Sequence, residues 1–350
     1  MIRIAALTAA LLGGVAVAPA VFAQDKTEVT FFIWAGSNQG VVPTEIIEAY
    51  RAANPNVTIN ILESNNAITY PQMVAARRTT PDNPLVHCGF FNADAITKGD
   101  AEGMWDVLDV AAVPNLTNVM ENFRRAEDRG VGYQMNAVGI LYNKDAVPTP
   151  PTSWADLWSE AYEGRVTMFD YDTRMMAVAA KLNGGDEFNI DPGFKVWAEN
   201  AKNFRALVDS NDAVKNLLVS GDAWAAPWFS SISNVWIEEG GPFAFAVPKE
   251  GAIAFPSYLA IVDGSDEAEK AVCASLINSL LEAENAGRYG DLTSSIPVVS
   301  NAVLTEKQKT NPMLQLSLAE ESIVFDYGHI GEVTPDWRQR WDREVKVNMR

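Results

Sequence analysis

The feature that most constrains the fold of this chain is an alternation of strand-like and helix-like segments. A β-branched and aromatic run at 28–34 is typical of a buried strand, and the apolar spacing at 44–53 is typical of a helix. A strand-like run at 57–62, helical spacing at 72–79 and a strand-like run at 85–88 follow. Strands that alternate with helices predict an α/β sheet with crossover connections.

The same alternation returns in the middle and late parts of the chain. The predicted strands there are 137–142, 165–169, 244–247 and 258–262, and the predicted helices are 154–160, 174–182 and 266–281. Asp266 and Glu267 stand near the positive end of the last helix, where acidic residues are favourable. A chain of 350 residues is long enough for two lobes with separate cores.

The first residues predict an export signal. Arg3 supplies a positive charge, and 4–21 is an uncharged, Ala-rich apolar stretch that ends in the small-x-small pattern of residues 21–23. We therefore expect residues 1–23 to be a cleaved signal peptide and the mature protein to be exported. A membrane anchor is the alternative, but the stretch is short and contains glycine and proline.

Charge and cysteine content narrow the range of partners. The formal net charge of −18 would repel nucleic acid and anionic lipid and attract cationic solutes, although it also serves solubility alone. Cys88 and Cys273 are the two cysteines, and an exported protein permits a disulfide without requiring one. Their spacing fits no metal motif, and the sequence leaves open whether they pair.

No motif indicates catalysis. The two histidines, His87 and His329, stand in no metal-binding or nucleophile-base pattern, and neither phosphate-loop nor serine-hydrolase motifs occur. Carboxylates are plentiful, but nothing singles out one acid/base pair. An exported hydrolase remains an alternative, while the sequence favours a protein that is not an enzyme.

Several short motifs together carry a resemblance that spans most of the chain after the signal peptide. They are Phe-Ile-Trp at 32–34, Gly-Ile-Leu-Tyr-Asn-Lys-Asp at 139–145, Pro-Thr-Ser-Trp-Ala-Asp-Leu at 151–157, Gly-Arg-Val at 164–166, Gly-Asp-Ala-Trp at 221–224, Val-Pro-Lys-Glu-Gly at 247–251 and Glu-Asn-Ala at 284–286. In order and spacing the chain resembles the bacterial extracellular solute-binding proteins of ABC importers, of the spermidine/putrescine-binding type.

The resemblance implies a two-lobed periplasmic binding protein fold, type II-like, with the ligand in a cleft between the lobes. It implies that the chain crosses between the lobes twice, near 132–136 and near 252–257. Lobe 1 would then hold 26–132 plus 256–302, and lobe 2 would hold 133–255 plus 303–350. The expected mechanism is hinge closure around the ligand, which the importer's membrane subunits then recognise. We expect a periplasmic monomer with no cofactor, metal or nucleic acid. Ferric-ion binders in related families use paired tyrosines, and the sequence contains no Tyr-Tyr run, so we do not expect iron binding.

Cleft residues of such proteins lie at strand ends and in loops. The predicted ligand-binding residues are Trp34, Ser37, Asn38, Cys88, Phe90, Phe91, Asn92, Asn136, Asp170, Asp172, Trp228, Phe255, Ser257, Tyr258, Ser294 and Ser295. Some have a second interpretation: Asp170 could cap the helix near Thr173, and one of Phe90 and Phe91 is expected to face the core. Trp154, Trp158, Trp337 and Trp341 have helical spacing, which indicates packing.

One departure from the resemblance concerns the substrate. After the Pro-Lys-Glu-Gly turn, polyamine binders place a Trp and, two residues on, an Asp that holds an amine; this chain has Phe255 and Ser257. A small amine-bearing, polyamine-like solute is the leading expectation, with Asp170 or Asp172 replacing the lost acid. The hydroxyls near 230, 257 and 294 also suit a zwitterion or oxyanion such as an amino-phosphonate. A chemosensory or structural partner protein is a further alternative.

Overall fold

The computed structural model describes residues 26–36, 38–170 and 172–349. The predicted signal peptide 1–23 and the predicted ligand contact Ser37 lie outside the described residues. Within the described part of the chain, none of the helices combines the length and the apolar character of a membrane span.

The strands of the described residues form one mixed sheet that passes through the whole molecule. They are β1 (Thr27–Trp34), β2 (Val57–Ser64), β3 (Cys88–Asn92), β4 (Val131–Asn143), β5 (Val166–Phe169), β6 (Phe204–Val208), β7 (Ala225–Phe229), β8 (Phe243–Ala246), β9 (Ile253–Ile261) and β10 (Ile296–Pro297). The order is β2-β1-β3-β9-β4-β7-β5-β6, with β8 and β10 pairing with β4. The sheet is parallel at β2-β1-β3 and at β7-β5-β6, and antiparallel around β4 and β9. This pattern confirms the predicted α/β class.

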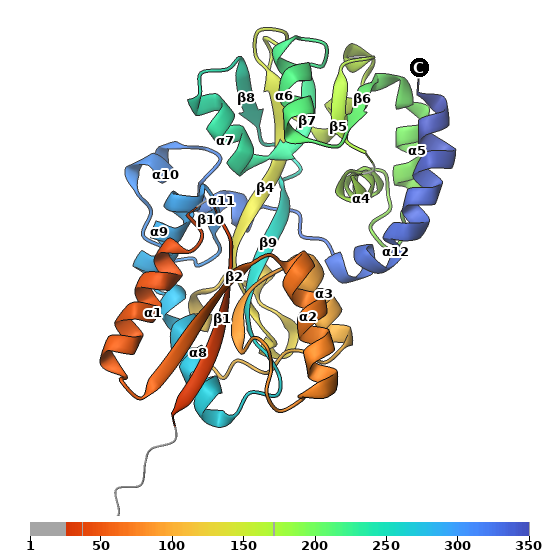
Figure 1. Cartoon of the computed structure of the whole chain (residues 1–350). Coiled ribbons are helices and arrows are strands. Elements are labelled where there is room, and N and C mark those ends of the chain that lie inside the picture. The colour runs from red at the N-terminus through yellow and green to blue at the C-terminus, as the bar shows by residue number, and fades with distance from the viewer. Residues whose placement is uncertain (1–25, 37, 171, 350) are drawn as a thin grey trace, which may run out of the picture.

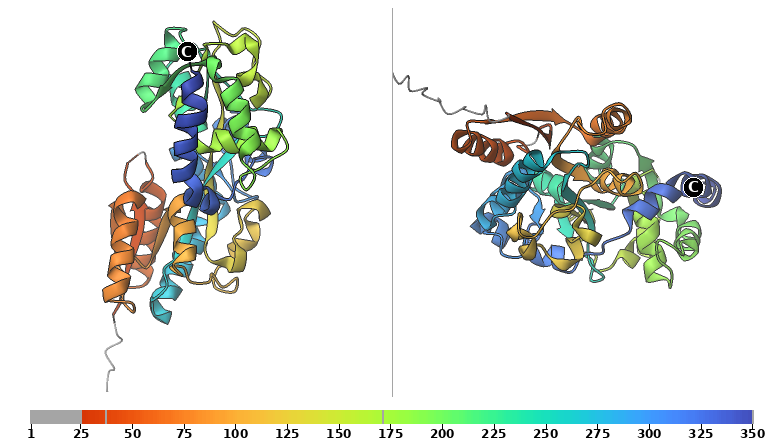
Figure 2. Two further views of the ribbon diagram at one scale, coloured as in Figure 1. Left: turned by 90° about the vertical axis from the view of Figure 1, so that its right-hand side faces the viewer. Right: turned by 90° about the horizontal axis from the view of Figure 1, so that it is seen from below.

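Helices cover both faces of this sheet (Figures 1 and 2). They are α1 (Val41–Ala53), α2 (Asn66–Thr79), α3 (Ala93–Ala101), α4 (Thr173–Leu182), α5 (Asp191–Glu199), α6 (Asn211–Val219), α7 (Ser230–Glu238), α8 (Glu267–Leu280), α9 (Ala283–Thr293), α10 (Glu306–Thr310), α11 (Leu316–Glu320) and α12 (Tyr327–Arg340). The helix expected at 154–160 is instead a 3-10 helix, Trp154–Trp158. Polar side chains begin several helices: Asn65, Asn92, Asp172 and Asp266 accept backbone N–H groups at the starts of α2, α3, α4 and α8.

Two lobes are visible in Figure 1. We call lobe 1 the lower part, with β1–β3, α1–α3, α8 and α9, and lobe 2 the upper part, with β5–β8 and α4–α7. The long strands β4 and β9 run through both. On β4, Met135 and Ala137 pack in a core of lobe 1, whereas Val138 and Ile140 pack in a core of lobe 2. The residue boundaries between the lobes remain a prediction.

The C-terminal segment, for which the predicted division gives 303–350 to lobe 2, packs against cores of both lobes. Leu318 and Ala319 on α11 pack in the same core as β1 of lobe 1, whereas Ile323, Phe325 and Ile330 pack in a core of lobe 2. The start of α12 then packs on both α3 and α4. The physical reason is that the apolar side chains of α11 face the end of lobe 1 that carries β10 and β4. The tail therefore contacts both lobes.

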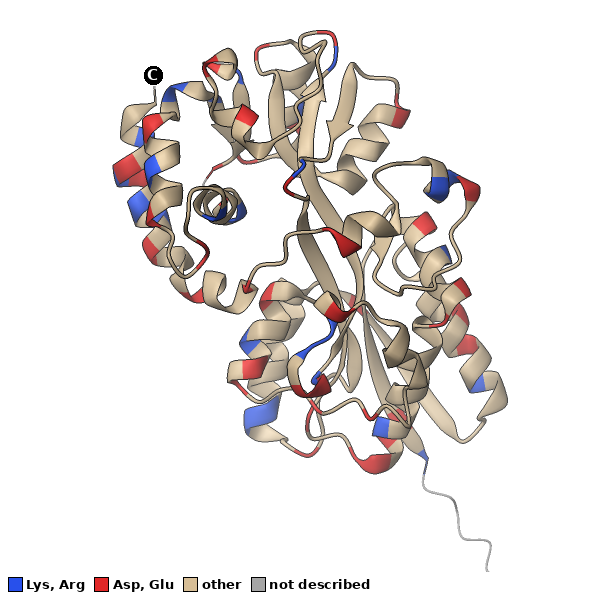
Figure 3. Ribbon diagram, turned by 180° about the vertical axis from the view of Figure 1, so that it is seen from behind, with Lys and Arg blue, Asp and Glu red and all other residues tan. Residues whose placement is uncertain are grey.

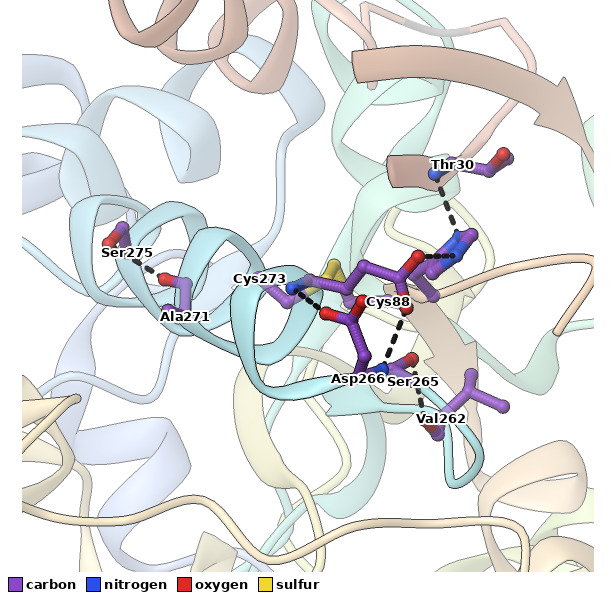
Figure 4. Close-up of a disulfide and its surroundings, with 10 residues drawn as sticks. Thr30, Cys88, Val262, Ser265, Asp266, Ala271, Cys273 and Ser275 are labelled. Carbon is purple, nitrogen blue, oxygen red and sulfur yellow. Dashed lines mark hydrogen bonds and ion pairs between the residues drawn. A yellow bond between two sulfur atoms is a disulfide. The ribbon is translucent and has the colours of Figure 1, made fainter. Parts of the chain in front are cut away.

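Cys88 on β3 and Cys273 on α8 form a disulfide, which answers the question that the sequence left open (Figure 4). Both residues are fully buried in the core of lobe 1. Next to them, His87 accepts the backbone N–H of Thr30 at Nδ1 and turns Nε2 to the Glu269 carboxylate at 3.3 Å. The disulfide thus ties the sheet of lobe 1 to the helix that covers one face.

Candidate ligand-binding site

A pocket of about 480 Å³ lies where residues of both lobes and α12 meet. Its walls come from the start of α3, just after β3, the ends of β5 and β7, the start of α4, the first residues of β9 and one side of α12. The lining residues are Ala93, Asp94, Phe169, Asp170, Asp172, Thr173, Arg174, Phe229, Phe255, Tyr327, Ile330, Gly331 and Thr334. This volume suits a small organic molecule, and carboxyl ends of strands are the usual ligand-binding edge of α/β sheets.

Arg174 and Asp172 form a two-pronged ion pair at the start of α4. Arg174 donates through Nε to Oδ1 at 2.8 Å and through Nη2 to Oδ2 at 2.6 Å, and the two side chains are only 11% and 3% exposed. The same Asp172 caps α4 by accepting the backbone N–H of Arg174. Burial lowers the pKa of the Arg174 guanidinium, but the charge and hydrogen bonds of Asp172 outweigh this effect and raise it above its usual value. Arg174 is therefore a fixed cation in the wall.

Aromatic rings flank this cation. The guanidinium carbon of Arg174 lies 4.6 Å from the ring centre of Phe229 and 5.5 Å from that of Phe255. The ring of Tyr327 stands perpendicular to Phe255 at 6.0 Å, and its hydroxyl donates to the backbone oxygen of Ala254. Burial raises the pKa of Tyr327 far above its usual value, so this hydroxyl stays neutral. The rings fix the direction in which Arg174 points.

The other two carboxylates of the pocket also have basic partners. Asp170 accepts from Lys346 at 2.6 Å and from the indole N–H of Trp341 at 3.3 Å. Asp94, on the lobe 1 side, accepts from Lys98 at 2.9 Å. Acidic and basic residues are also mixed over the surfaces of both lobes (Figure 3). The excess negative charge of the chain is thus not concentrated as unpaired carboxylates in this pocket.

Three of the predicted ligand-binding residues line the pocket: Asp170, Asp172 and Phe255. Asp172, rather than Asp170, caps α4, so the expected capping role belongs to its neighbour. Whether these residues contact a ligand remains a prediction.

The predictions on β3 rested on a strand placed too early. The strand was expected at 85–88 with a loop after it, but β3 is Cys88–Asn92, so the supposed loop residues are the strand itself. Phe90 and Phe91 are fully buried on opposite faces, in two separate cores of lobe 1, because helices cover both faces of the sheet. The expectation that one of these two rings faces the cleft is therefore wrong. Cys88 is not available to a ligand either, because its sulfur is in the disulfide and the residue has no exposed surface.

Trp34 and Asn92 lie together at the carboxyl ends of β1 and β3 but do not line the pocket. The indole N–H of Trp34 donates to Asn66 Oδ1 at 2.8 Å, and the same oxygen accepts the backbone N–H of Asn92 at 3.1 Å. The Asn92 side chain caps α3. Asn38 lies on the surface and donates to the backbone oxygen of Leu292. These side chains hold strand and helix ends of lobe 1 together.

Trp228 is 1% exposed and packs in a core of lobe 2, with its ring 4.5 Å from Phe169. Successive strand residues point to opposite faces, so the next residue, Phe229, lines the pocket instead. Asn136 on β4 lies directly opposite Phe255 on β9, and its buried Oδ1 has no hydrogen-bond partner among the described residues. Tyr258 packs in a core of lobe 1 beneath Arg125.

The predicted serines belong to a different polar cluster, between β4 and the end of α9. Ser295 donates to Gln134 Oε1 and lies 2.6 Å from the Thr293 hydroxyl through its Oγ. Ser294 ends α9 in a left-handed conformation, with φ of 52°. Ser257 is paired with Gln134 and Asn92 in the sheet and is 7% exposed. None of these three serines lines the pocket.

The lining residues that sequence reasoning missed include Asp94, Arg174, Phe229, Tyr327 and the tail residues near Ile330. Phe229 was within one residue of a predicted contact, and correct strand alternation would have found it. Arg174 stood inside a predicted helix, and its position in the first turn, beside its own capping Asp172, was the available signal. No sequence signal marked the α12 residues, because they reach the pocket only through the path of the C-terminal segment. No group of three or more His, Cys, Asp or Glu among the described residues could hold a metal ion.

Comparison with known proteins places the chain among transport proteins. A family model described as bacterial extracellular solute-binding protein matches residues 86–320. A spermidine/putrescine-binding periplasmic protein from Escherichia coli (strain K12) is 27% identical over 286 residues, 78% of each chain. One from Haemophilus influenzae is 25% identical over 255 residues, 70% of this chain and 69% of that one.

Solved structures show the same fold. The structure of an ABC transporter protein from Clostridium perfringens has a TM-score of 0.78 at 19% identity and covers 91% of this chain and 100% of that chain. A spermidine/putrescine ABC transporter substrate-binding protein from Streptococcus pneumoniae has a TM-score of 0.71 at 17% identity, with 91% and 99% covered. These likenesses confirm the predicted two-lobed periplasmic binding protein fold.

Proposed function

The chain belongs to the bacterial extracellular solute-binding protein family, and on that premise we propose that it captures a small amine-bearing organic solute in the pocket between its lobes. It is a periplasmic solute-binding component of an ABC transporter. The family and the relatives are binding proteins rather than enzymes, so the exported hydrolase is set aside. Export through the signal peptide at 1–23 and a monomeric state belong to this proposal.

The single observation that carries the proposal is that one pocket takes its walls from both lobes. Asp94 comes from lobe 1, Arg174 and Phe229 come from lobe 2, and Phe255 lies on a strand that both lobes share. A solute that touches all of these walls interacts with the lobes only when they are close together. Such a solute shifts the population toward a closed form, which the membrane subunits of an importer can distinguish from the open one.

An amine-bearing solute is supported by the relatives, whose names state that they bind spermidine and putrescine. Phe229 and Phe255 provide ring faces for an alkyl chain or an ammonium group.

A thermal-shift screen over polyamines, amino acids, amino-phosphonates, thiamine and oxyanions tests the proposal, followed by titration calorimetry on the hits. A solute at a hundredfold excess over its dissociation constant should stabilise the protein by about 3 kcal/mol. Phe229→Ala should weaken the hit about tenfold, because a ring face beside the ligand is removed. Phe245→Ala is the matched control: Phe245 lies on β8, which pairs with β4, and it does not line this pocket, so affinity should be unchanged. The proposal fails if no small solute stabilises the protein, or if both variants act alike.

A further inference from the structure

We infer that the pocket selects a zwitterion, a solute with a carboxylate as well as an amine, over a polyamine whose polar groups are all cationic. This inference rests on the proposed function and names the substrate class for the same pocket. It departs from the polyamine expectation because of the way in which charges are paired around the cavity.

Every carboxylate of the pocket already has a cationic partner. Asp172 gives both oxygens to Arg174, Asp170 is bonded by Lys346 and Trp341, and Asp94 is bonded by Lys98 through one oxygen. A diamine would share these acids with the cations that already bond them. A dication therefore enters a site whose acids are already neutralised.

Arg174, in contrast, has N–H donors that Asp172 does not use. A guanidinium carries five N–H groups in one plane, and Asp172 engages only Nε and Nη2. Nη1 makes no hydrogen bond to any described residue, while the side chain lines the cavity and stays partly exposed. Phe229 and Phe255 hold the plane in place. A fixed fork with free N–H groups is the arrangement that binds carboxylates best, and it repels an ammonium group placed at the same spot.

An acceptor for the amine end lies on the strand beside Phe255. Asn136 is directly opposite Phe255 in the antiparallel pair of β4 and β9, so the two side chains share one face of the sheet. The Oδ1 atom of Asn136 is buried and has no hydrogen-bond partner among the described residues. A buried acceptor without a partner is unfavourable. Asn136 does not itself line the pocket, but its neighbour Phe255 does, and an ammonium group that reached past the Phe255 ring would satisfy the Oδ1 atom. Arg174 and Asn136 together offer one group of each polarity.

Matched compounds test this inference. Titration calorimetry compares each diamine of three to six carbons with amino acids of the same carbon number. The amino acids carry the amine either next to the carboxylate or at the far end of the chain. In the four-carbon set, putrescine is compared with 2-aminobutyrate and 4-aminobutyrate. We expect at least one amino acid to bind ten times more tightly than its matching diamine. The inference is overturned if every diamine binds at least as tightly as its partners, or if none of these compounds binds.

Variants of Arg174 give the second arm. In Arg174→Gln the best amino acid should bind at least thirtyfold more weakly, while the matching diamine binds more tightly because Asp172 is released. Opposite changes cannot arise from a folding defect. If Arg174→Gln does not fold, Arg174→Lys keeps the charge and loses the fork, and should weaken the amino acid about tenfold. Equal weakening of both ligands would contradict the inference.

The two proposals fail in different ways. If every diamine binds at least as tightly as its matching amino acids, the zwitterion inference is wrong and the solute-binding role in transport stands. If no solute of any class stabilises the protein in the broad screen, the proposed function itself is wrong.

Discussion

The two lobes share an α/β architecture, but they are reinforced differently. Lobe 1 carries the disulfide between Cys88 and Cys273. Lobe 2 contains no cysteine, and its cores hold eight of the ten tryptophans of the chain. The other two, Trp34 and Trp105, belong to lobe 1. Three large rings, Trp197, Phe204 and Trp341, pack against one another in its main core.

Stability and the pocket are coupled in lobe 2 but not in lobe 1. In lobe 1 the disulfide lies at the start of β3, four residues or about 13 Å from the end that reaches the pocket. In lobe 2 the reinforcing residues contact the wall directly, since Trp341 and Lys346 both bond Asp170, which lines the pocket. We therefore expect changes in lobe 1 to alter stability alone, and changes in lobe 2 to alter stability and ligand affinity together.

The largest expected effect follows from Trp341→Ala. This ring is fully buried among Trp197 and Phe204, so its removal should lower the free energy of unfolding by about 3–5 kcal/mol. Because Asp170 also loses an indole donor, ligand affinity should change as well. Chemical denaturation followed by tryptophan fluorescence, together with calorimetry, measures both quantities.

Trp154→Ala is the matched control for that variant. Trp154 is equally buried in the same core, and its indole donates to the backbone oxygen of Gly251 rather than to a pocket residue. It should destabilise lobe 2 similarly and leave affinity unchanged. Loss of affinity in both variants would break the proposed link between Trp341 and the pocket.

A smaller effect is expected from replacing both cysteines. Cys88→Ala with Cys273→Ala removes a cross-link between residues 185 apart in sequence, which should destabilise the protein by about 3 kcal/mol. Affinity should stay the same, because the disulfide is at the far end of β3. Hydrogen exchange should report the loss in β3 and α8. Reduction of the native protein should reproduce the effect and leave the double variant unaffected; a changed affinity would contradict the comparison.

The smallest effect on stability is expected from Lys346→Ala. Its ion pair with Asp170 is about one-third exposed on each side, so the loss should stay below about 1 kcal/mol. Asp170 would then face the pocket without its cation, and a diamine should bind a few times more tightly. Lys202→Ala, which breaks a similar surface pair with Glu163 in lobe 2, is the control for which no affinity change is expected. Calorimetry with putrescine distinguishes the two.

The sequence predicted the elements of the fold better than the site. Hydrophobic alternation located most strands, and the capping residue Asp266 correctly began α8. Trp337 and Trp341 were correctly assigned to packing rather than to binding. The boundary of β3, in contrast, was misplaced by three residues, because a strand buried on both faces shows no alternation to fix its position.

For the site, the sequence pointed to Asp170, Asp172 and Phe255, which line the pocket. It could not show that Asp170 was already paired, because Lys346 lies 176 residues from Asp170 in the chain and only the path of the tail brings them together. The same path adds Tyr327 and Ile330 to the wall.

By itself, the sequence determined the α/β class, the resemblance to solute-binding proteins and the types of side chain available at strand ends. Those properties follow from local patterns of apolar and polar residues. The tertiary structure was needed to show that Lys346 neutralises Asp170 and that Arg174 turns its remaining donors to the pocket. An ion pair forms over a distance of a few ångströms, and Asp170 and Lys346 are far apart along the chain, so no local pattern encodes their contact.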